Sequence, residues 1–333
     1  MTTLAIIGGG IAGRTLAFTL AKEKKNYSRI LFFQSESFAK ACSWRSTAIV
    51  APRGVTKGHS ALGDFLMDSY ECFKSHWLED APQGVYPIMQ YTGALTKLDA
   101  FKTRYPQGEV VSEAGPLSLK SSMYLAYEKA FMIDPDIYLP WLLETAKKTA
   151  PLEVKNEFIT HVENNLLKTQ CGKSYKVDEI VFATGASTRF LKNLSQDKKV
   201  LSSKAVQGSY FVFSMDLGEE SFSLTLEGDN LIYHAHTKKV LVGSTTQESF
   251  LEIPPTVDLR VIYQRLSELL TIKLPDFSQG EIKLGLREKA SKREPYFVRE
   301  KNMSFIGGLY KNGYSAGLKI SRDFASHQSH GNV

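Results

Sequence analysis

The chain has 333 residues, of which 43% are hydrophobic, and its formal net charge is +6. A chain of this length can bury a sizeable core and is expected to form two domains. No apolar run approaches the length of a membrane span, which excludes a protein anchored by a transmembrane helix. The lysines are scattered in pairs, so nucleic acid is not favoured as a partner, although a weak attraction to anionic partners, tRNA included, remains open.

The three cysteines, Cys42, Cys72 and Cys171, show neither a C-x-x-C pattern nor metal-ligand spacing. We therefore expect reduced thiols, no metal site and a cytoplasmic location. The first apolar run has no basic residues before it, so we do not interpret it as a signal peptide.

Residues 3–13 join an apolar run to the pattern G-x-G-x-x-G, and an apolar-periodic helix follows. Gly8 would allow the tight turn, Gly10 would let a pyrophosphate approach the backbone, and Gly13 would let the helix pack closely on the strand. The free N–H groups at the helix start, around Ile11 and Ala12, would face the phosphates. This stretch predicts a dinucleotide-binding turn; the alternative is a glycine-rich turn without a ligand.

A second apolar run, residues 30–33, predicts a parallel strand buried on both faces. Gln34 stands at its end, where a ribose-binding Asp or Glu is usual. Its amide can bond a ribose hydroxyl, but without the charge assistance of a carboxylate.

The middle of the chain predicts alternating helices and strands. Residues 61–79 have helical spacing, residues 86–98 alternate as strands, and residues 152–169 read as strands around a turn at Asn164–Asn165. A helix ending at Thr149 is predicted to begin at Asp134 and Pro135, which are favoured at the cap and first turn.

The later elements return to both patterns. Residues 177–182 predict a strand that ends in Ala183, Thr184 and Gly185, small residues that let backbone lie close to a ligand. Residues 205–247 predict an antiparallel sheet, and residues 258–274 an amphipathic helix. Residues 303–317 predict a strand, a glycine-rich loop and a short last helix.

Nucleotide-domain signals thus occur at the beginning, middle and end of the chain, with β-rich segments between them. This order differs from that of nicotinamide dehydrogenases, whose nucleotide domain is usually continuous. The chain resembles, over nearly its whole length, the D-amino-acid oxidase and glycine oxidase (DAO) family of FAD-dependent oxidoreductases. The resemblance is carried by residues 8–13, 45–48, 133–135, 182–186, 285–287 and 308–313.

The resemblance implies an α/β fold with an inserted α+β domain. A Rossmann-like FAD-binding domain would be assembled from residues 1–80, 134–200 and 285–333. A substrate domain with a mixed or antiparallel sheet would comprise residues 81–133 and 201–284. FAD would be bound non-covalently, because some relatives attach it to a Cys near the C-terminal third and no Cys lies beyond Cys171.

The resemblance also implies roles for individual residues. Arg45, Ser46, Thr47 and Ala48 would pass beside the flavin ring, with Ala48 where the family usually has Gly. Ile159 would contact the adenine through its backbone. The C-terminal loop would place backbone N–H groups near the flavin pyrimidine edge, where negative charge grows on reduction. Its residues are Gly308, Lys311, Asn312, Gly313, Tyr314 and Ser315.

Two residues are candidates for binding the substrate. Arg287 would form two bonds to a substrate carboxylate, for which a planar guanidinium is suited. The alternative is an ion pair with Glu288, which stands where the family usually has Pro. Tyr233 would orient an amine, but its register is ambiguous by one residue, and His234 and His236 read equally as surface residues.

Three functions remain open from the sequence. The first is FAD-dependent oxidation of the C–N bond of a small amine or amino acid, by hydride transfer to flavin N5, with O₂ or another electron acceptor. The second is an FAD-dependent oxidative step on a modified tRNA uridine. The third is a flavin-binding protein with little turnover, suggested by Gln34, Ala48 and Glu288.

Overall fold

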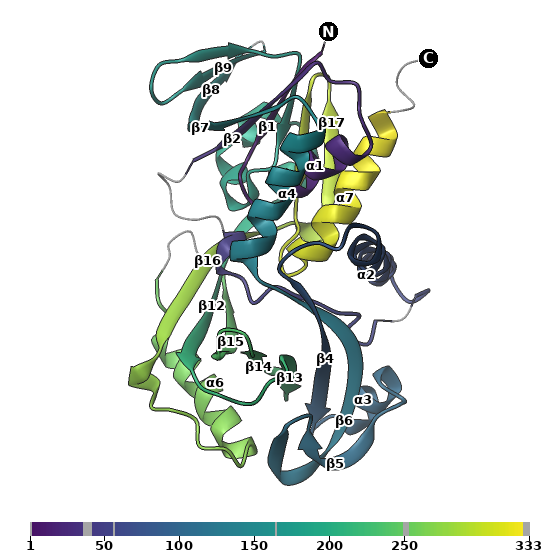
Figure 1. Cartoon of the computed structure of the whole chain (residues 1–333), viewed down its shortest axis with the longest axis vertical. Coiled ribbons are helices and arrows are strands. Elements are labelled where there is room, and N and C mark those ends of the chain that lie inside the picture. Colours follow the sequence, from purple (N-terminus) through teal and green to yellow (C-terminus); the bar gives the residue numbers. More distant parts are fainter. Residues whose placement is uncertain (1, 36–41, 56, 164, 249–252, 329–333) are drawn as a thin grey trace.

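The computed structural model describes residues 2–35, 42–55, 57–163, 165–248 and 253–328. The chain builds two lobes, one above the other in Figure 1, each organised around its own sheet. Strands and helices from both ends of the chain meet in the upper lobe, which holds both termini (Figure 1).

The upper lobe contains a six-stranded sheet in the order β17-β18-β11-β1-β2-β7. All its pairs are parallel except β17 with β18. Its strands are β1 (Thr3–Ile7), β2 (Arg29–Gln34), β7 (Leu152–Asn156), β11 (Glu179–Phe182), β17 (Tyr296–Glu300) and β18 (Met303–Gly307).

Helices cover one face of this sheet and a small antiparallel sheet covers the other. Leu4 and Ile6 of β1 pack with α1, α4 and α7, whereas Ala5 and Ile7 pack with residues of β9. This alternation follows from the two-residue period of a strand, with both faces buried. The covering elements are α1 (Ile11–Lys22), α2 (Ala61–Asp80), α4 (Pro135–Thr149), α7 (Gly313–Gln328), β8 (Ile159–Glu163), β9 (Leu166–Thr169) and β10 (Ser174–Lys176).

The lower lobe contains a nine-stranded sheet in the order β16-β12-β15-β14-β13-β4-β6-β3, with β5 paired to β6. Only β13 and β4 are parallel neighbours, so the sheet is mixed. Its strands are β3 (Ile49–Val50), β4 (Val85–Ala94), β5 (Glu109–Ala114), β6 (Leu117–Ile133), β12 (Lys204–Ser214), β13 (Phe222–Leu226), β14 (Asp229–His234), β15 (Lys239–Gln247) and β16 (Glu281–Lys289).

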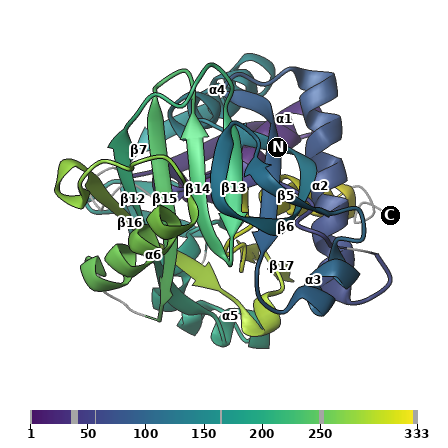
Figure 2. The ribbon, with the colours of Figure 1, turned by 90° about the horizontal axis from the view of Figure 1, so that it is seen from below.

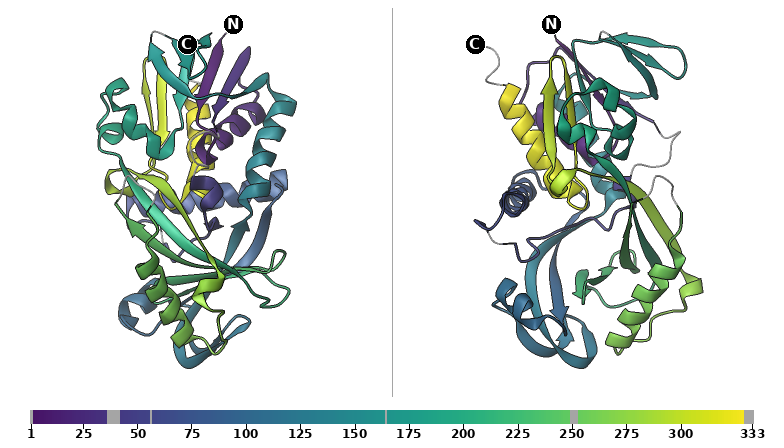
Figure 3. Two further views of the ribbon diagram at one scale, coloured as in Figure 1. Left: turned by 90° about the vertical axis from the view of Figure 1, so that its left-hand side faces the viewer. Right: turned by 180° about the vertical axis from the view of Figure 1, so that it is seen from behind.

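Helix α6 (Thr256–Leu269) lies across this sheet, as the view from below shows (Figure 2). Its buried residues Leu259, Ile262 and Leu266 follow helical spacing, and Ile262 and Leu266 pack on the strands in one cluster. The views from the side and from behind show the long strands of the lower sheet rising toward the upper lobe (Figure 3). The functional site lies where the lobes meet. The remaining short elements are α3 (Leu98–Arg104), α5 (Lys198–Leu201) and the 3-10 helices Cys42–Arg45, Gly185–Phe190, Lys192–Leu194, Phe277–Gln279 and Ser291–Arg293.

Most predicted elements are present, with three differences. Residues 86–98 predict strands, whereas the structure has one strand, β4, that ends at Ala94, and α3 begins at Leu98. Helix α6 ends at Leu269 rather than at residue 274, and α7 has 16 residues rather than forming a short helix. Asn164, in the predicted turn, lies outside the described residues. None of the helices in the described ranges combines the length and apolar character of a membrane span.

Candidate functional site

A large cavity of about 1540 Å³ runs between the two lobes. Its wall includes the β1–α1 turn, residues 42–48, the end of β11, strands β12 and β16, and the loop after β18. These segments are far apart in the sequence, and the sheet topology brings them together. The order of the parallel strands places the β1 and β11 ends side by side.

The β1–α1 turn forms one end of the cavity, as its glycine pattern predicts. Gly8 has a φ of +132°, and a Cβ at this position would overlap the Ala183 carbonyl. Gly10 stands at the N-cap of α1, where it offers no side-chain acceptor. The start of the helix is therefore open to an anion, which the N–H groups and helix dipole favour.

Gly8, Gly10, Ile11 and Ala12 line the cavity, whereas Gly13 lies behind them. A Cβ at Gly13 would overlap the Gly8 carbonyl oxygen, so this glycine allows the close contact between helix and turn. The Ile11 N–H donates to Ser43 Oγ over 3.0 Å.

Gln34 lines the cavity, but both ends of its amide already have partners in the protein. Arg14 donates from Nη2 to Gln34 Oε1 over 2.8 Å, and Gln34 Nε2 donates to Asn156 Oδ1 over 2.8 Å. Arg14 also donates to the Leu139 carbonyl and is 5% exposed. The sequence places Arg14 on a helix but does not reveal this link to the end of β2.

The region between β8 and the ends of the parallel strands β1 and β11 forms the next part of the cavity wall. Ile159, Ala183, Thr184 and Gly185 all line the cavity there. Thr184 Oγ1 is 3.0 Å from Thr188 Oγ1, which ties the end of β11 to the following 3-10 helix.

Residues 45–48 also line the cavity. Arg45 donates from Nη1 to the Leu284 carbonyl over 3.2 Å, and the Ala48 N–H donates to Ser46 Oγ over 3.1 Å. Ala48 has a φ of +45°, a conformation that explains a preference for glycine at this position. The chain retains this conformation with an alanine that is buried in the core.

The loop after β18 supplies Lys311 and Asn312 to the wall, and the first turn of α7 supplies Gly313, Tyr314 and Ser315. Tyr314 donates from its hydroxyl to the Ser43 carbonyl over 2.6 Å, which holds this loop against residues 42–48. Gly308 does not line the cavity, because its N–H is turned back toward Glu288.

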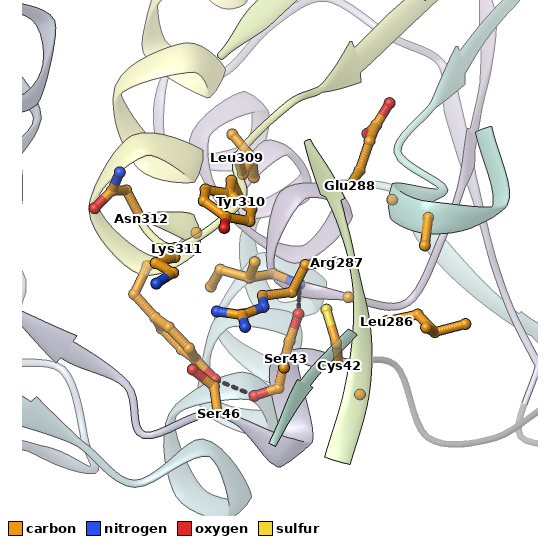
Figure 4. A pocket seen from close by; sticks show the side chains of 18 of the residues that line it. Cys42, Ser43, Ser46, Leu286, Arg287, Glu288, Leu309, Tyr310, Lys311 and Asn312 are labelled. Atoms are coloured by element: carbon orange, nitrogen blue, oxygen red, sulfur yellow. Dashed lines mark hydrogen bonds between the residues drawn. The ribbon is translucent and has the colours of Figure 1, made fainter. Parts of the chain in front are cut away.

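Arg287 extends from β16 into the cavity, beside Lys311 and Tyr310 (Figure 4). Its guanidinium carbon lies 5.4 Å from the Tyr310 ring centroid, and Nη2 makes one long bond of 3.4 Å to the Thr245 carbonyl. Nε is buried without a hydrogen-bond partner. Burial lowers the pKa of Arg287, as expected for a charge removed from water.

Gly208 on β12 provides the space for this guanidinium. Val206 is the register partner of Arg287, so Gly208 is its diagonal neighbour on the same face. A Cβ at Gly208 would overlap the Arg287 guanidinium. The sequence contains no local signal for this requirement, because the two residues lie on separate strands.

Glu288 points to the other side of β16, so the alternative of an Arg287–Glu288 ion pair is wrong (Figure 4). Its carboxylate accepts from the Tyr296 hydroxyl over 2.7 Å and from the Gly308 N–H over 3.1 Å. Burial raises the pKa of Glu288. Adjacent residues of a strand face opposite sides, which explains the separation.

Tyr233 does not line the cavity, whereas its neighbour Ile232 does. The Tyr233 ring is fully buried in the core of the lower lobe, and its hydroxyl donates to the Gly218 carbonyl over 2.8 Å. The prediction that Tyr233 orients an amine is therefore wrong. The ambiguous register of one residue is the reason, because such a shift exchanges the two faces of a strand.

The cavity wall is strongly cationic. It includes eight Lys and Arg side chains but three Glu side chains. Each Glu is engaged by the chain itself: Glu157 by Lys173 and Tyr175, Glu227 by the backbone at Leu95 and Thr96, and Glu288 as above. The cations are Arg14, Arg45, Arg53, Lys97, Arg104, Arg189, Arg287 and Lys311. Within the described ranges, no group of three or more His, Cys, Asp or Glu side chains is placed to hold a metal ion.

The geometry fits FAD as the cofactor. The start of helix α1 at Gly10 and the small residues at the end of β11 flank one end of the cavity. The loop after β18 lines the same cavity, together with Arg287. A dinucleotide held by its phosphates at Gly10 would reach this loop through residues 42–48.

Comparison with known proteins supports this reading. Residues 3–326 match the family model described as FAD dependent oxidoreductase (DAO). The chain is 22% identical to glycine oxidase of Bacillus subtilis (strain 168) over 339 residues, covering 92% of this chain and 88% of that protein.

Two solved structures share the fold. Glycine oxidase from Geobacillus kaustophilus has a TM-score of 0.79 at 16% identity, covering 100% of this chain and 96% of that chain. Iminodiacetate oxidase from Chelativorans sp. BNC1 has a TM-score of 0.80 at 15% identity, covering 98% and 95%. Together with the glycine turn and the cavity, the match of nearly the whole chain to the family model shows that this protein belongs to the DAO family of FAD-dependent oxidoreductases.

Proposed function

We propose that this protein oxidises the C–N bond of a small amine that carries a carboxylate, with Arg287 binding that carboxylate. The observation that carries the proposal is the Arg287 guanidinium, which enters the cavity without an acidic partner and has Nε unbonded. A buried cation of this kind is costly unless an anion completes its bonds. The similarity to glycine oxidase and iminodiacetate oxidase supports an amine substrate of this class.

The chain's own groups supply binding and orientation rather than acid–base chemistry. Arg287 offers two parallel N–H groups to a carboxylate, and Gly208 keeps the space for them open. Bound FAD would supply the two-electron oxidation of the carbon next to the amine. Lys311, whose pKa is lowered to about 8, is the titratable amine beside Arg287.

The proposal includes the division of the chain into an FAD-binding domain and a substrate domain, with boundaries after residues 80, 133, 200 and 284. Strand β16 runs across the last of these boundaries, so Arg287 would reach the cofactor domain from the substrate sheet. A cytoplasmic location is also proposed, on the support of three cysteines that are all free thiols.

The test is a spectrum of the purified yellow protein, recorded without oxygen and with a panel of amines and amino acids of both hands. Bleaching of the flavin by a carboxylate-bearing amine supports the proposal. Bound flavin that no member of the panel bleaches contradicts it. RNA retained at physiological salt, with bleaching only in its presence, would favour the tRNA alternative instead.

A further inference from the structure

Three cations of the cavity wall are candidates for binding anionic groups of a substrate. Arg287, Lys311 and Arg53 all line the wall. Within the described ranges, none of them forms an ion pair with a carboxylate; Arg287 and Lys311 instead lie over the ring of Tyr310. One carboxylate on Arg287 would therefore leave positive charge on the same wall unneutralised.

Hydrogen bonds to the backbone of Arg53 and Gly54 hold this segment in place, and none of them uses the Arg53 side chain. The Gly54 N–H donates to Glu128 Oε1 over 3.0 Å, and Arg104 donates to the Arg53 carbonyl. No hydrogen bond to the Arg53 guanidinium occurs in the described part of the chain. Burial lowers the pKa of Arg53 and the neighbouring Arg104 acts in the same direction, whereas Tyr105 and the Glu128 carboxylate act in the opposite direction.

Lys311 connects the two guanidinium groups electrostatically. Its side chain is open to the cavity, and partial burial together with the nearby Arg287 and Arg53 lowers the pKa of Lys311 to about 8. Lys311 therefore lies within electrostatic range of both guanidinium groups, and all three side chains line the same cavity.

Gln90 provides a second, independent sign of an unfilled polar site. It is 6% exposed and lines the cavity, yet its Oε1 has no hydrogen-bond partner. Gln90 is the register partner of Glu128, the residue that holds the Arg53–Gly54 segment. Gln90 and Glu128 thus lie on one face of the β4–β6 pair, which is separated in the sheet from β16, the strand that carries Arg287.

We propose that the substrate is an amine with two anionic groups, one bound by Arg287 and the second by Arg53, with Lys311 as the third cation of the same wall. This inference rests on the proposed function and adds a substrate class to it. The second group is a carboxylate or a phosphonate-like oxyanion, because a guanidinium binds both through paired oxygens.

The experiment compares matched substrates on the FAD-loaded enzyme. Glycine and alanine are set against aspartate, glutamate, iminodiacetate and 2-amino-3-phosphonopropionate, with both hands of each chiral compound. We expect at least one compound with two anionic groups to exceed every monocarboxylate in kcat/KM by tenfold or more. Which of the carboxylate and phosphonate compounds leads identifies the second group. Equal or greater efficiency with the monocarboxylates would overturn the inference.

Arg53→Gln is the decisive variant, and Lys129→Gln, an exposed residue next to Glu128 on β6, is its matched control. Arg53→Gln should reduce kcat/KM for the preferred doubly anionic substrate by at least tenfold more than it reduces kcat/KM for monocarboxylates. Lys129→Gln should change neither. A loss of equal size for both substrate classes would mean that Arg53 is structural, and the inference would fail.

A ligand-binding measurement tests this inference independently of the proposed function. If no amine bleaches the flavin, perturbation of the flavin spectrum by succinate and by acetate still measures the site. We expect succinate to bind at least tenfold more tightly than acetate, and Arg53→Gln to remove the difference. Equal affinities in the wild type would overturn the second anionic site, whatever the enzyme oxidises.

Discussion

Arg287 and Glu288 are adjacent on β16, yet they serve opposite sides of the strand. The Arg287 guanidinium enters the cavity above Gly208, whereas the Glu288 carboxylate binds Tyr296 and the Gly308 N–H. The two side chains therefore have separable functions: Arg287 faces the proposed substrate, and Glu288 holds the start of the loop that carries Lys311. The first two predictions follow from this separation.

Arg287→Ala should remove two charge-assisted hydrogen bonds to the substrate carboxylate, each worth about 1.5–3 kcal/mol. We expect kcat/KM to fall on the order of a hundredfold or more, with normal flavin content. Arg287→Lys should recover only part of the loss, because a point charge cannot reproduce the planar pair of donors. An unchanged Kd for a carboxylate inhibitor in Arg287→Ala would show that Arg287 is not the substrate residue.

Glu288→Ala should show the opposite pattern. It leaves the Tyr296 hydroxyl and the Gly308 N–H buried without an acceptor, which costs about 1–3 kcal/mol of unfolding free energy. The Kd for a carboxylate inhibitor should stay within about twofold of wild type, since the side chain faces away from Arg287. Glu281→Ala, an exposed acid at the start of the same strand, is the control and should change neither quantity. Denaturant unfolding and inhibitor titration measure the two effects, and a large loss of inhibitor affinity with unchanged stability would contradict this assignment.

Gly208→Ala tests the space for the guanidinium. The added methyl would overlap Arg287, so the guanidinium must move and kcat/KM should fall about tenfold or more, in the same direction as Arg287→Ala. Ser214→Ala, at the exposed end of β12, is the matched control. Flavin content should remain normal in both. If Gly208→Ala retains full activity, the position of Arg287 in the cavity is not required for catalysis.

Gly10→Val tests the phosphate end of the cavity. Gly10 has a φ of −80°, which valine can adopt, so the fold should persist. Its side chain would occupy the space of the pyrophosphate and abolish flavin binding. Acid denaturation of the wild type should release all flavin to the supernatant, because the cofactor is non-covalent. Normal flavin content in the variant, with an unchanged melting temperature, would show that the phosphate site lies elsewhere.

His234 should make the stability depend on pH. Burial, with His236 nearby, lowers the pKa of His234 from 6.5 to about 4, and its Nε2 has no hydrogen-bond partner. The unfolded chain therefore binds a proton more readily than the folded chain between pH 6.5 and pH 4. The contribution of neutral His234 to the free energy of unfolding is complete above pH 6.5. This free energy falls as the pH is lowered, by about 2 kcal/mol at pH 5. Urea unfolding at pH 7 and pH 5 measures this loss, and His234→Gln should reduce it; an equal loss in the variant would assign it to other groups.

Local rules explain what could be predicted from the sequence. The β1–α1 turn was predictable because its glycines are required by backbone geometry within a few residues, as Gly8 is at its positive φ. Helix α4 begins as predicted because the Asp134 side chain accepts from the Asp136 N–H, a contact between residues two apart. The family followed from several such local motifs in one order.

The residues that face the proposed substrate were decided by contacts between distant strands. A strand exposes alternate residues to each side, so a register that is uncertain by one residue cannot distinguish Tyr233 from Ile232. For the same reason, the side chains of the adjacent residues Arg287 and Glu288 face opposite sides of the strand. Arg53 and Gly208 carry no local motif; each acquires its place from a strand that is distant in the chain. The sequence by itself thus determined the cofactor turn and the class of protein, because these depend on short-range geometry. Only the tertiary structure decided which side chains line the substrate end of the cavity, because strand pairing and the free energy of burying or pairing each charge are properties of the whole fold.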